Sequence, residues 1–225
     1  MSQPAPPPVI AIDGPSASGK GTVAQLAARH LGFHFLDSGA LYRLVALAAL
    51  DAGAILDDDS RISDIARKLN VTFSENLIYL GGSEVSLAIR AERVAEAASR
   101  VAALPGVRHA LLQRQRDYRR PPGLVADGRD MGSVVFTDAA LKVFLTATPE
   151  ERARRRYKQL MEKGLSANMA ILVQDIRARD TRDSARAVAP LEKAPDAVQI
   201  DTTGMTVDTV VAEVLARFTA AQRAP

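Results

Sequence analysis

Short apolar runs alternate along most of the chain with stretches in which apolar residues recur every three or four positions. Short uninterrupted runs fit buried strands, whereas the longer periodicity fits helices that cover a sheet. Together they predict an α/β fold with a parallel sheet flanked by helices. Five strands are expected, at 9–12, 33–36, 124–126, 141–145 and 197–200.

Helix signals follow several of these runs. Ser38 is a plausible N-cap for a helix from Ala40 to Asp51 that ends at Gly53. A helical run of small residues stops before Pro105. Further helices are expected at 23–31, 91–103 and 207–218.

The segment 71–87 interrupts this alternation. Three short β-like runs, at 71–73, 77–80 and 85–87, are separated by polar and glycine-rich turns. They predict a small antiparallel meander inserted into the βα chain.

An arginine-rich segment forms the second interruption. Thr148-Pro149-Glu150-Glu151 is a capping box with proline in the first turn, so a helix is expected from there to about Gly164. Its Arg152, Arg155 and Arg156 share one face, where like charges repel. Either Glu150, Glu151 and Glu162 offset that charge on a solvated face, or a triphosphate does so and the segment is a lid.

A second arginine-bearing helix follows. Arg179, Arg182 and Arg186 recur on it, with Asp183 alongside. The pattern fits either an exposed, salt-bridged helix or contacts to phosphate and ribose, with Asp183 accepting a sugar hydroxyl.

Composition narrows the function classes. The 225 residues are 47% hydrophobic and 24% charged, as in an ordinary globular domain. Cysteine is absent, which excludes thiol nucleophiles and cysteine metal sites, and the three histidines are scattered. The net charge of +3 arises from local arginine clusters, which favour phosphate sites over a broad nucleic-acid surface.

The proline-rich residues 1–8 lack the basic and apolar regions of a signal peptide, so we expect a disordered tail. The chain contains no apolar run of about 18 residues, which a membrane span would need. A cytoplasmic location is therefore expected.

The most informative motif is the glycine-rich turn between the first strand and the first helix. Its G-x-x-x-x-G-K spacing is that of a phosphate-binding P-loop, with Lys20 placed to reach the outer phosphates of a nucleotide. Backbone N–H groups at a helix N-terminus favour an anion. The expected ATP-binding residues are Gly14, Pro15, Ser16, Ala17, Ser18, Gly19, Lys20, Gly21 and Thr22.

One position departs from the general motif. Ser or Thr normally follows the lysine as a magnesium ligand, but this chain has Gly21 there and Thr22 one residue later. Either Thr22 serves the metal indirectly, or magnesium is held by phosphate and water.

Phosphoryl transfer to a small acceptor needs a second anion site, for which arginine forks are suited. Ligands of α/β enzymes bind beyond the carboxyl ends of strands. Arg43 follows the second strand there, and Arg129 and Asp130 follow the third. The alternative for the turn 127–130 is an acid that only caps a helix.

Four segments together resemble a known family. They are 14–22, Asp-Ser-Gly-Ala-Leu-Tyr-Arg at 37–43, Asp-Gly-Arg-Asp-Met-Gly at 127–132, and the run from Arg182 to Leu191. From about residue 9 to 218 the chain resembles the bacterial cytidylate kinases. The middle two segments are far more specific than the P-loop, and the Gly21-Thr22 ending is typical of nucleoside monophosphate kinases.

The resemblance implies a five-stranded parallel sheet of adenylate-kinase type, flanked by helices. It also implies a short helical lid at about 152–166 and an inserted nucleotide-monophosphate domain with a three-stranded antiparallel sheet. That domain would span 66–103, and the core would comprise 9–65 and 104–225.

The resemblance also implies residue roles. Ser99, Arg108 and Asp130 would face cytosine; Ser38, Arg179 and Asp183 would hold the sugar; Arg43, Arg129 and Arg186 would bind the acceptor phosphate. Lys20, Arg129, Arg155 and Arg156 would be catalytic. From the residues alone, Ser99 could equally be a packed helix serine, and Arg108 would pass as a surface arginine.

The implied activity is transfer of the γ-phosphoryl group of ATP to CMP or dCMP, with Mg²⁺ carried by ATP. We expect a monomer that binds neither nucleic acid nor membrane. The alternative is a P-loop kinase for another small acceptor, such as UMP or shikimate. A GTPase switch or nucleic-acid-binding regulator is disfavoured, because Asn-Lys-x-Asp is absent, the D-x-x-G at 201–204 lies far from its usual place, and aromatics are only 4% of the chain.

Overall fold

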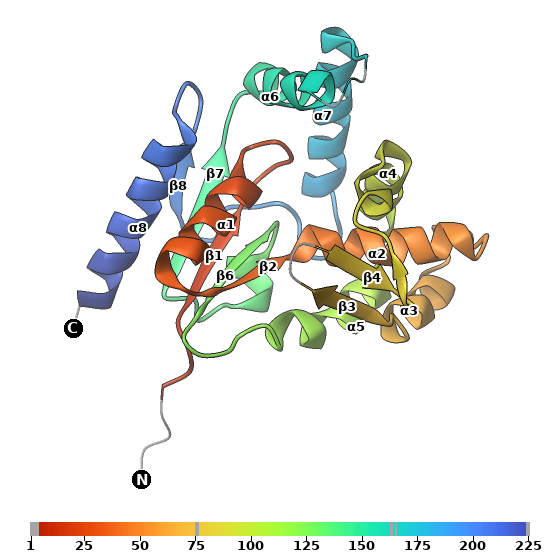
Figure 1. The fold of residues 1–225 in the computed structure, drawn as a ribbon, viewed down its shortest axis with the longest axis horizontal. Helices are drawn as coiled ribbons and strands as arrows, with labels where there is room; N and C mark the ends of the chain where they lie inside the picture. Colours follow the sequence, from red (N-terminus) through yellow and green to blue (C-terminus); the bar gives the residue numbers. More distant parts are fainter. Residues whose placement is uncertain (1–4, 75–76, 163, 165, 224–225) are drawn as a thin grey trace. The chain divides into compact units, whose positions relative to one another are not determined.

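The structure, a computed structural model, describes residues 5–74, 77–162, 164 and 166–223. The chain forms two compact units. The first unit comprises Met1–Leu36 and Asp117–Pro225, and the second comprises Asp37–Arg116. Figure 1 shows the helices and strands of both units. The second unit contains the segment 66–103, whose role as a separate nucleotide-monophosphate domain stays a prediction.

The first unit is built on a five-stranded sheet, as predicted. The strand order is β2-β6-β1-β7-β8, and β1 lies parallel to β6 and β7 on either side. All five strands end one or two residues later than expected. The strand pairing continues past the apolar runs, so that Asp13 is opposite Gly128 and Thr146 is opposite Asp201. The strands are β1 (Val9–Asp13), β2 (His34–Asp37), β6 (Leu124–Gly128), β7 (Leu141–Thr146) and β8 (Val198–Asp201).

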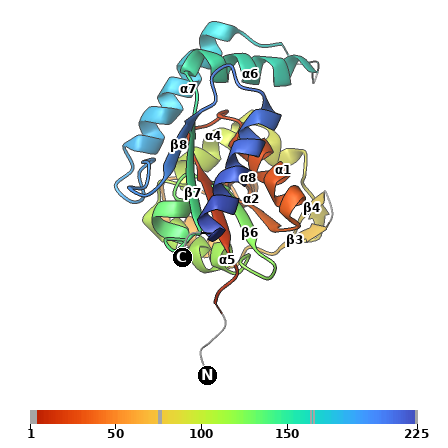
Figure 2. The same cartoon turned by 90° about the vertical axis from the view of Figure 1, so that its left-hand side faces the viewer.

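Helices α1 (Lys20–Leu31) and α8 (Val207–Arg223) cover one face of this sheet. Figure 2 shows them side by side in front of the strands. The core between helices and sheet is fully apolar and includes Ile10, Val143 and Val214. This burial is the main stabilisation of the first unit, since apolar area removed from water contributes about 25 cal/mol per Å².

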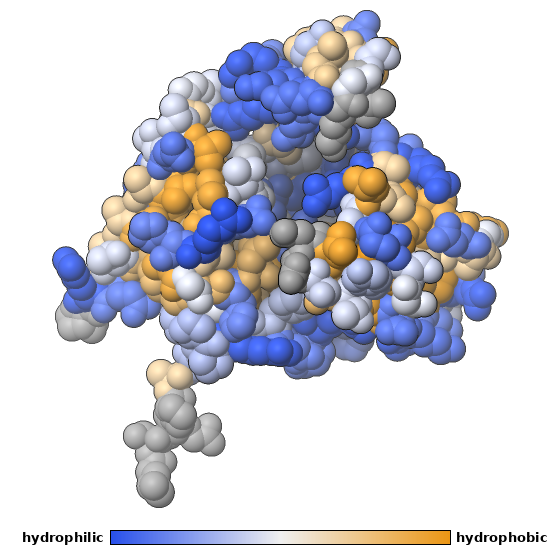
Figure 3. All heavy atoms as spheres, viewed as in Figure 1, coloured by the Kyte–Doolittle hydropathy of each residue, from blue (hydrophilic) through white to orange (hydrophobic). Residues whose placement is uncertain are grey.

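Three further elements complete the first unit. They are a π-helical turn, η2 (Met131–Val135), and the helices α6 (Pro149–Glu162) and α7 (Met169–Ser184), which pack against each other. Half of the capping box that predicts α6 is formed: Thr148 Oγ1 accepts the backbone N–H of Glu151 at 3.2 Å. The Thr148 N–H instead donates to Thr203 Oγ1 at 3.2 Å, because the Glu151 carboxylate pairs with Arg154 and Arg155. Side chains of α6 give a largely hydrophilic surface (Figure 3). Arg186, expected on the second arginine helix, lies just beyond the end of α7.

The second unit combines helices with a small antiparallel sheet of order β3-β4-β5. Its helices α2 and α4 pack together, as do α3 and α5. Its elements are α2 (Ser38–Asp51), α3 (Asp59–Arg67), β3 (Val71–Ser74), β4 (Leu77–Leu80), β5 (Ser83–Glu84), η1 (Ala88–Arg90), α4 (Glu92–Val101) and α5 (Pro105–Arg116).

The third strand of the meander was predicted two residues too late. β5 is Ser83–Glu84, and Leu80 pairs with Ser83 across Gly81 and Gly82. Both glycines have positive φ, 57° and 88°, as a two-residue hairpin turn requires. The strand therefore resumes directly after the turn, and the apolar run 85–87 lies outside it.

The predicted cap of α2 was also wrong. Asp37, not Ser38, is the N-cap, and its carboxylate accepts the backbone N–H of Ala40 at 3.0 Å. Ser38 is the first helical residue. Two helices, α3 and α5, were not predicted. α5 starts at Pro105-Gly106, which was read as a break, yet proline is favoured at a first helical position.

Candidate active site

The loop 14–22 joins β1 to α1 and packs closely on β7. Gly14 has φ 149°, and a Cβ there would lie 2.1 Å from the Leu145 carbonyl oxygen. No side chain fits at that position. Gly19, at φ 91°, caps the start of α1. The glycines thus let the backbone turn sharply into a helix N-terminus, whose N–H groups favour an anion.

The Lys20 side chain lies within this loop. It is only 8% exposed, and its Nζ donates to the Pro15 carbonyl at 3.1 Å. The Asp127 Oδ1 at the end of β6 lies 3.9 Å from Nζ. The ammonium group is therefore already positioned over the loop where outer phosphates of a nucleotide would bind.

Asp127 also explains the departure from the P-loop motif. A Cβ at Gly21 would lie 2.9 Å from the Asp127 Oδ2. This carboxylate is buried, so it has little room to move aside. A Ser or Thr directly after Lys20 would crowd the Asp127 carboxylate, which explains why glycine occupies this position.

Arg152 on α6 is buried and does not form part of a solvated face. Its guanidinium forms a bidentate pair with Asp180 of α7, at 2.9 and 2.5 Å. It also donates to the carbonyls of Ala147 and Ser16, at 3.0 and 3.2 Å. The solvated-face alternative is therefore wrong for Arg152, which connects α6 of the predicted lid to α7 and to the P-loop backbone.

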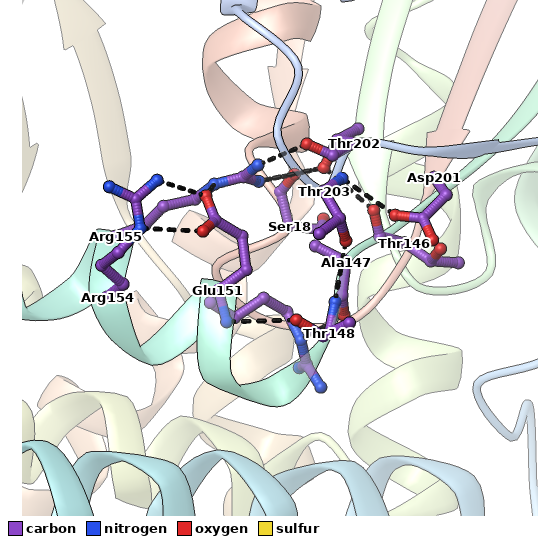
Figure 4. A network of polar contacts seen from close by, with 11 residues as sticks. Ser18, Thr146, Ala147, Thr148, Glu151, Arg154, Arg155, Asp201, Thr202 and Thr203 are labelled. Atoms are coloured by element: carbon purple, nitrogen blue, oxygen red, sulfur yellow. Dashed lines mark hydrogen bonds and ion pairs between the residues drawn. The ribbon is translucent and has the colours of Figure 1, made fainter.

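Arg155, one turn further along α6, contacts the P-loop and the end of β8 (Figure 4). Its Nη1 donates to the Ser18 carbonyl and to Thr202 Oγ1, each at 3.0 Å. Its Nη2 donates to the Thr202 carbonyl at 2.6 Å, and its Nε pairs with Glu151 at 2.9 Å. A permanent positive charge is thus fixed beside Gly19, whose Cβ position lies 3.5 Å from Nη1.

A second charge cluster joins the end of β6 to α7. Asp183 is fully buried; it accepts from Arg129 Nε at 3.0 Å and from Arg186 Nη2. Burial alone would raise the pKa of Asp183, but Arg129, Arg186 and Arg179 together hold that pKa below its ordinary value. The carboxylate therefore stays ionised and holds the arginine forks in place. The exposed-helix alternative is wrong for Asp183.

In the second unit, Ser38 and Arg43 lie on α2. Ser38 is buried in the first turn, and Arg43 Nη1 donates to the Ile89 carbonyl of η1 at 3.2 Å. The neighbouring Tyr42 is buried, and the Arg108 guanidinium stacks over its ring at 5.7 Å.

Arg108 and Ser99 are both buried in this unit. Arg108, on α5, is 8% exposed and donates to the Ala102 carbonyl at 3.0 Å, so it is not a surface arginine. Ser99, on α4, is 3% exposed, and its Oγ has no hydrogen-bond partner among the described residues. An unpaired buried hydroxyl costs free energy, which fits a group that awaits a ligand.

The first unit thus brings together the P-loop, Lys20, Arg155 and the Arg129–Asp183–Arg186 cluster. Asp130 is buried at the start of η2, and Arg156 is half-buried on α6. The binding roles assigned to these residues and to Ser38, Arg43, Ser99 and Arg108 stay predictions.

Sequence reasoning missed two residues at the P-loop. Asp13, directly before Gly14, binds the turn that follows β6. Thr202 lies in the D-x-x-G segment, which was considered only as a GTPase motif. Their position at strand ends, beside polar loops, was the available signal.

Comparisons with known proteins agree with this arrangement. The profile of the cytidylate kinase family matches residues 10–220. Cytidylate kinase of Nitrosomonas europaea is 56% identical over 217 residues, which cover 96% of this chain and 97% of that protein. Cytidylate kinase of Chromobacterium violaceum is 59% identical over 211 residues, or 94% and 95% of the two chains.

A solved structure of an uncharacterised protein from Eubacterium ventriosum shares the fold, with a TM-score of 0.52 at 11% identity and coverage of 94% and 98%. The fold likeness is broad, but the P-loop with its buried lysine and the family match over nearly the whole length are specific. On these grounds the chain belongs to the cytidylate kinase family.

Proposed function

We propose that this protein transfers the γ-phosphoryl group of ATP to CMP or dCMP, giving ADP and CDP or dCDP. The observation that carries the proposal is the placement of Lys20 Nζ within the P-loop, 3.1 Å from the Pro15 carbonyl, in a member of the cytidylate kinase family. A buried ammonium at a helix N-terminus can bind the transferring phosphoryl group and offset the charge that develops on it.

The catalytic groups proposed are all cationic. Lys20, Arg129, Arg155 and Arg156 would stabilise the charge on the phosphoryl oxygens. The acceptor is a phosphate already ionised at neutral pH, so no general base is needed. Because Asp183 and the carbonyls of Ser18 and Thr202 orient Arg129 and Arg155, little reorganisation is required when substrates bind.

The acceptor contacts are proposed residue by residue. Ser99 supports a role toward cytosine, because its buried hydroxyl has no partner among the described residues. The Asp183 carboxylate and its arginines support contacts to sugar and phosphate, since arginine forks match phosphate oxygens. The proposed sets are Ser99, Arg108 and Asp130 for the base, Ser38, Arg179 and Asp183 for the sugar, and Arg43, Arg129 and Arg186 for the phosphate.

Mg²⁺ is proposed to enter with ATP. Among the described residues, no group of three or more His, Cys, Asp or Glu side chains could hold a metal ion. Thr22, exposed on the first turn of α1, is the hydroxyl nearest in sequence to the motif position. These residues fit a metal held by phosphate oxygens and water, with Thr22 as the protein's contribution. When bound, the ion neutralises charge on the polyphosphate.

A substrate panel tests the proposal. Wild-type protein with ATP and Mg²⁺ is assayed against CMP, dCMP, UMP, AMP and shikimate. Turnover of CMP and dCMP well above the others is expected. Preferential use of UMP or shikimate would replace the proposed acceptor, and no turnover with any of them would overturn the kinase assignment.

Lys20→Ala should lower kcat by a factor on the order of 10² or more while the protein stays folded. Lys68→Ala, which removes an exposed lysine from the second unit, is the matched control and should leave kcat unchanged. Near-wild-type turnover of Lys20→Ala would contradict the role of this ammonium group.

The remaining expectations concern location and assembly. No helix in the described part of the chain is both long and apolar enough to cross a lipid bilayer. We propose a cytoplasmic monomer without nucleic-acid partners, to be tested by cell fractionation, sedimentation and a gel-shift assay with RNA.

A further inference from the structure

Asp13 is a buried carboxylate to which the proposed mechanism gives no role. It is the last residue of β1, directly before Gly14 of the P-loop, and is 7% exposed. Its Oδ1 accepts the backbone N–H of Met131 at 2.8 Å, and its Oδ2 accepts that of Gly132 at 2.8 Å. The side chain therefore binds two consecutive peptide groups of the turn that follows β6.

These two hydrogen bonds continue the contact between β1 and β6 past the last paired residues of the two strands. β1 and β6 pair up to Asp13 and Gly128. Past Gly128 the chain leaves the sheet at Arg129 and Asp130 and enters η2 at Met131. Two parallel hydrogen bonds fix both the position and the orientation of this turn relative to the start of the P-loop.

Only a carboxylate supplies both acceptors. An asparagine at position 13 would offer one oxygen and one amide donor, and the donor would face a backbone N–H. No ion pair joins Asp13 to a cation within the described residues. Burial raises the pKa of Asp13 to about 7, and the nearby carboxylates of Asp130 and Asp127 add to this increase. The two backbone N–H groups lower the pKa but do not offset the effect of burial. Burying a carboxylate without a cation costs free energy, so a carboxylate at this position indicates that both of its acceptor oxygens are needed.

We propose that Asp13 is a positioning residue for the phosphate acceptor. It holds the Arg129–Gly132 turn against the P-loop, so that Arg129 and Asp130 bind the acceptor at a fixed position relative to Lys20. This inference rests on the proposed kinase activity. Although Asp13 directly precedes the P-loop, we expect it to affect binding of the acceptor and not binding of ATP.

Steady-state kinetics of Asp13→Asn test the inference above pH 7, where Asp13 of the wild type is ionised, with the acceptor varied at saturating ATP and ATP varied at saturating acceptor. The acceptor is whichever nucleotide wild type uses best in the substrate panel, so a wrong acceptor assignment does not affect the comparison. KM for the acceptor should rise at least about tenfold, because a bond to a charged group is lost and a donor is opposed to a donor. KM for ATP should change less than about twofold, and the preference for CMP over UMP should weaken.

The matched control is Asp58→Ala. Asp58 likewise accepts a backbone N–H, that of Arg61 at 3.0 Å, but it caps α3, where no site residue lies. Its loss should lower stability and leave both KM values unchanged. Equal changes of both KM values in Asp13→Asn, or unchanged kinetics, would overturn the inference and leave Asp13 a structural residue only.

Amide hydrogen exchange of the wild-type protein provides a test that does not require the variant to fold. Exchange at Met131 and Gly132 should be slowed strongly relative to unprotected amides, and binding of the acceptor nucleotide should slow it further. Rapid exchange at both amides would overturn the inference, since the two hydrogen bonds would then not persist in solution.

Discussion

Arg155 of the predicted lid helix donates two hydrogen bonds to Thr202 at the end of β8: Nη2 donates to the Thr202 carbonyl at 2.6 Å, and Nη1 donates to Thr202 Oγ1 at 3.0 Å. Thr202 is buried, and its hydroxyl also lies 2.9 Å from the Thr146 carbonyl. The hydroxyl also lies 3.2 Å from the Ser18 carbonyl, so one small side chain contacts α6, β7 and the P-loop (Figure 4).

Thr202→Val should impair the use of ATP. Valine keeps the shape of threonine but loses the hydroxyl that accepts from Arg155, so this arginine is held less firmly at the P-loop. We expect kcat/KM for ATP to fall about three- to tenfold, because one bond to a charged group is lost. Kinetics with ATP varied at saturating CMP measure the effect.

Thr202→Ser retains the hydroxyl and is the matched control; it should stay close to wild type. If Thr202→Val behaves like Thr202→Ser, the hydroxyl is not needed, and the carbonyls of Ser18 and Thr202 together with Glu151 position Arg155.

Ser99→Ala should separate stability from substrate binding. The Ser99 hydroxyl is buried without a partner among the described residues, so its removal should leave the free energy of unfolding unchanged or raise it by up to about 1 kcal/mol. If the hydroxyl binds cytosine, KM for CMP should rise about tenfold. Denaturant unfolding and CMP kinetics are measured on the same preparation.

Ser63→Ala is the control for this change. Ser63 is equally buried, but its hydroxyl donates to Asp59 at 3.0 Å. It should lose about 1 kcal/mol of stability with CMP kinetics unchanged. A Ser99→Ala variant that is less stable and has an unaltered KM would contradict the proposed contact.

Arg152→Met should destabilise the protein strongly. Removing this guanidinium leaves Asp180 without its bidentate partner and two carbonyls, of Ala147 and Ser16, without a donor. Arg152 is buried but the Asp180 side chain is 27% exposed, so the loss should not exceed the roughly 3–5 kcal/mol of a fully buried ion pair. Denaturant unfolding measures the loss.

Arg177→Met on α7 removes an exposed pair with Glu150 and should cost less than about 1 kcal/mol. Similar losses in both variants would show that the Arg152 pair is not the buried connection between α6, α7 and the P-loop.

The stability of the wild type should depend on pH through Asp13. Burial raises the pKa of Asp13 from 3.8 to about 7. Between these values the folded protein keeps a proton that the unfolded chain has released, so rising pH favours unfolding. The contribution of Asp13 is fully present below about pH 4 and is lost as pH approaches 7.

Relative to Asp13→Asn, the wild type should therefore lose up to a few kcal/mol of unfolding free energy across this range, since one pKa unit corresponds to about 1.4 kcal/mol. Unfolding of both proteins at several pH values measures the difference. A difference that does not change with pH would contradict the raised pKa.

Local patterns were sufficient for much of the fold. Apolar runs predicted all five strands of the parallel sheet. The signal is strongest for β1 and β6, which are buried along their whole length and therefore contain few polar residues. The capping-box sequence at Thr148 predicted the start of α6, because the bond between Thr148 Oγ1 and the Glu151 N–H lies within one turn. Likewise the P-loop follows from spacing alone, since the glycines and Lys20 act within nine residues.

Errors occurred where two local signals competed. Asp37 and Ser38 can both cap a helix, and in the structure Asp37 is the cap while Ser38 is buried in the first turn. Proline and glycine at 105–106 signal a break as readily as a helix start. The space at Gly106, where a Cβ would lie 2.4 Å from Ser63 Oγ, is set by the packing of α3 on α5.

The sequence by itself determined the chemistry of the protein: a P-loop, arginine clusters and the segments at 37–43 and 127–132 that mark the family. Tertiary structure decided what each charge does. Whether Arg152 faces water or Asp180, and whether Asp13 only ends a strand or binds the turn at Met131, depends on contacts between segments 28 and 118 positions apart. Burial then fixes the outcome, because a charge removed from water must be held by whatever polar groups the fold places beside it.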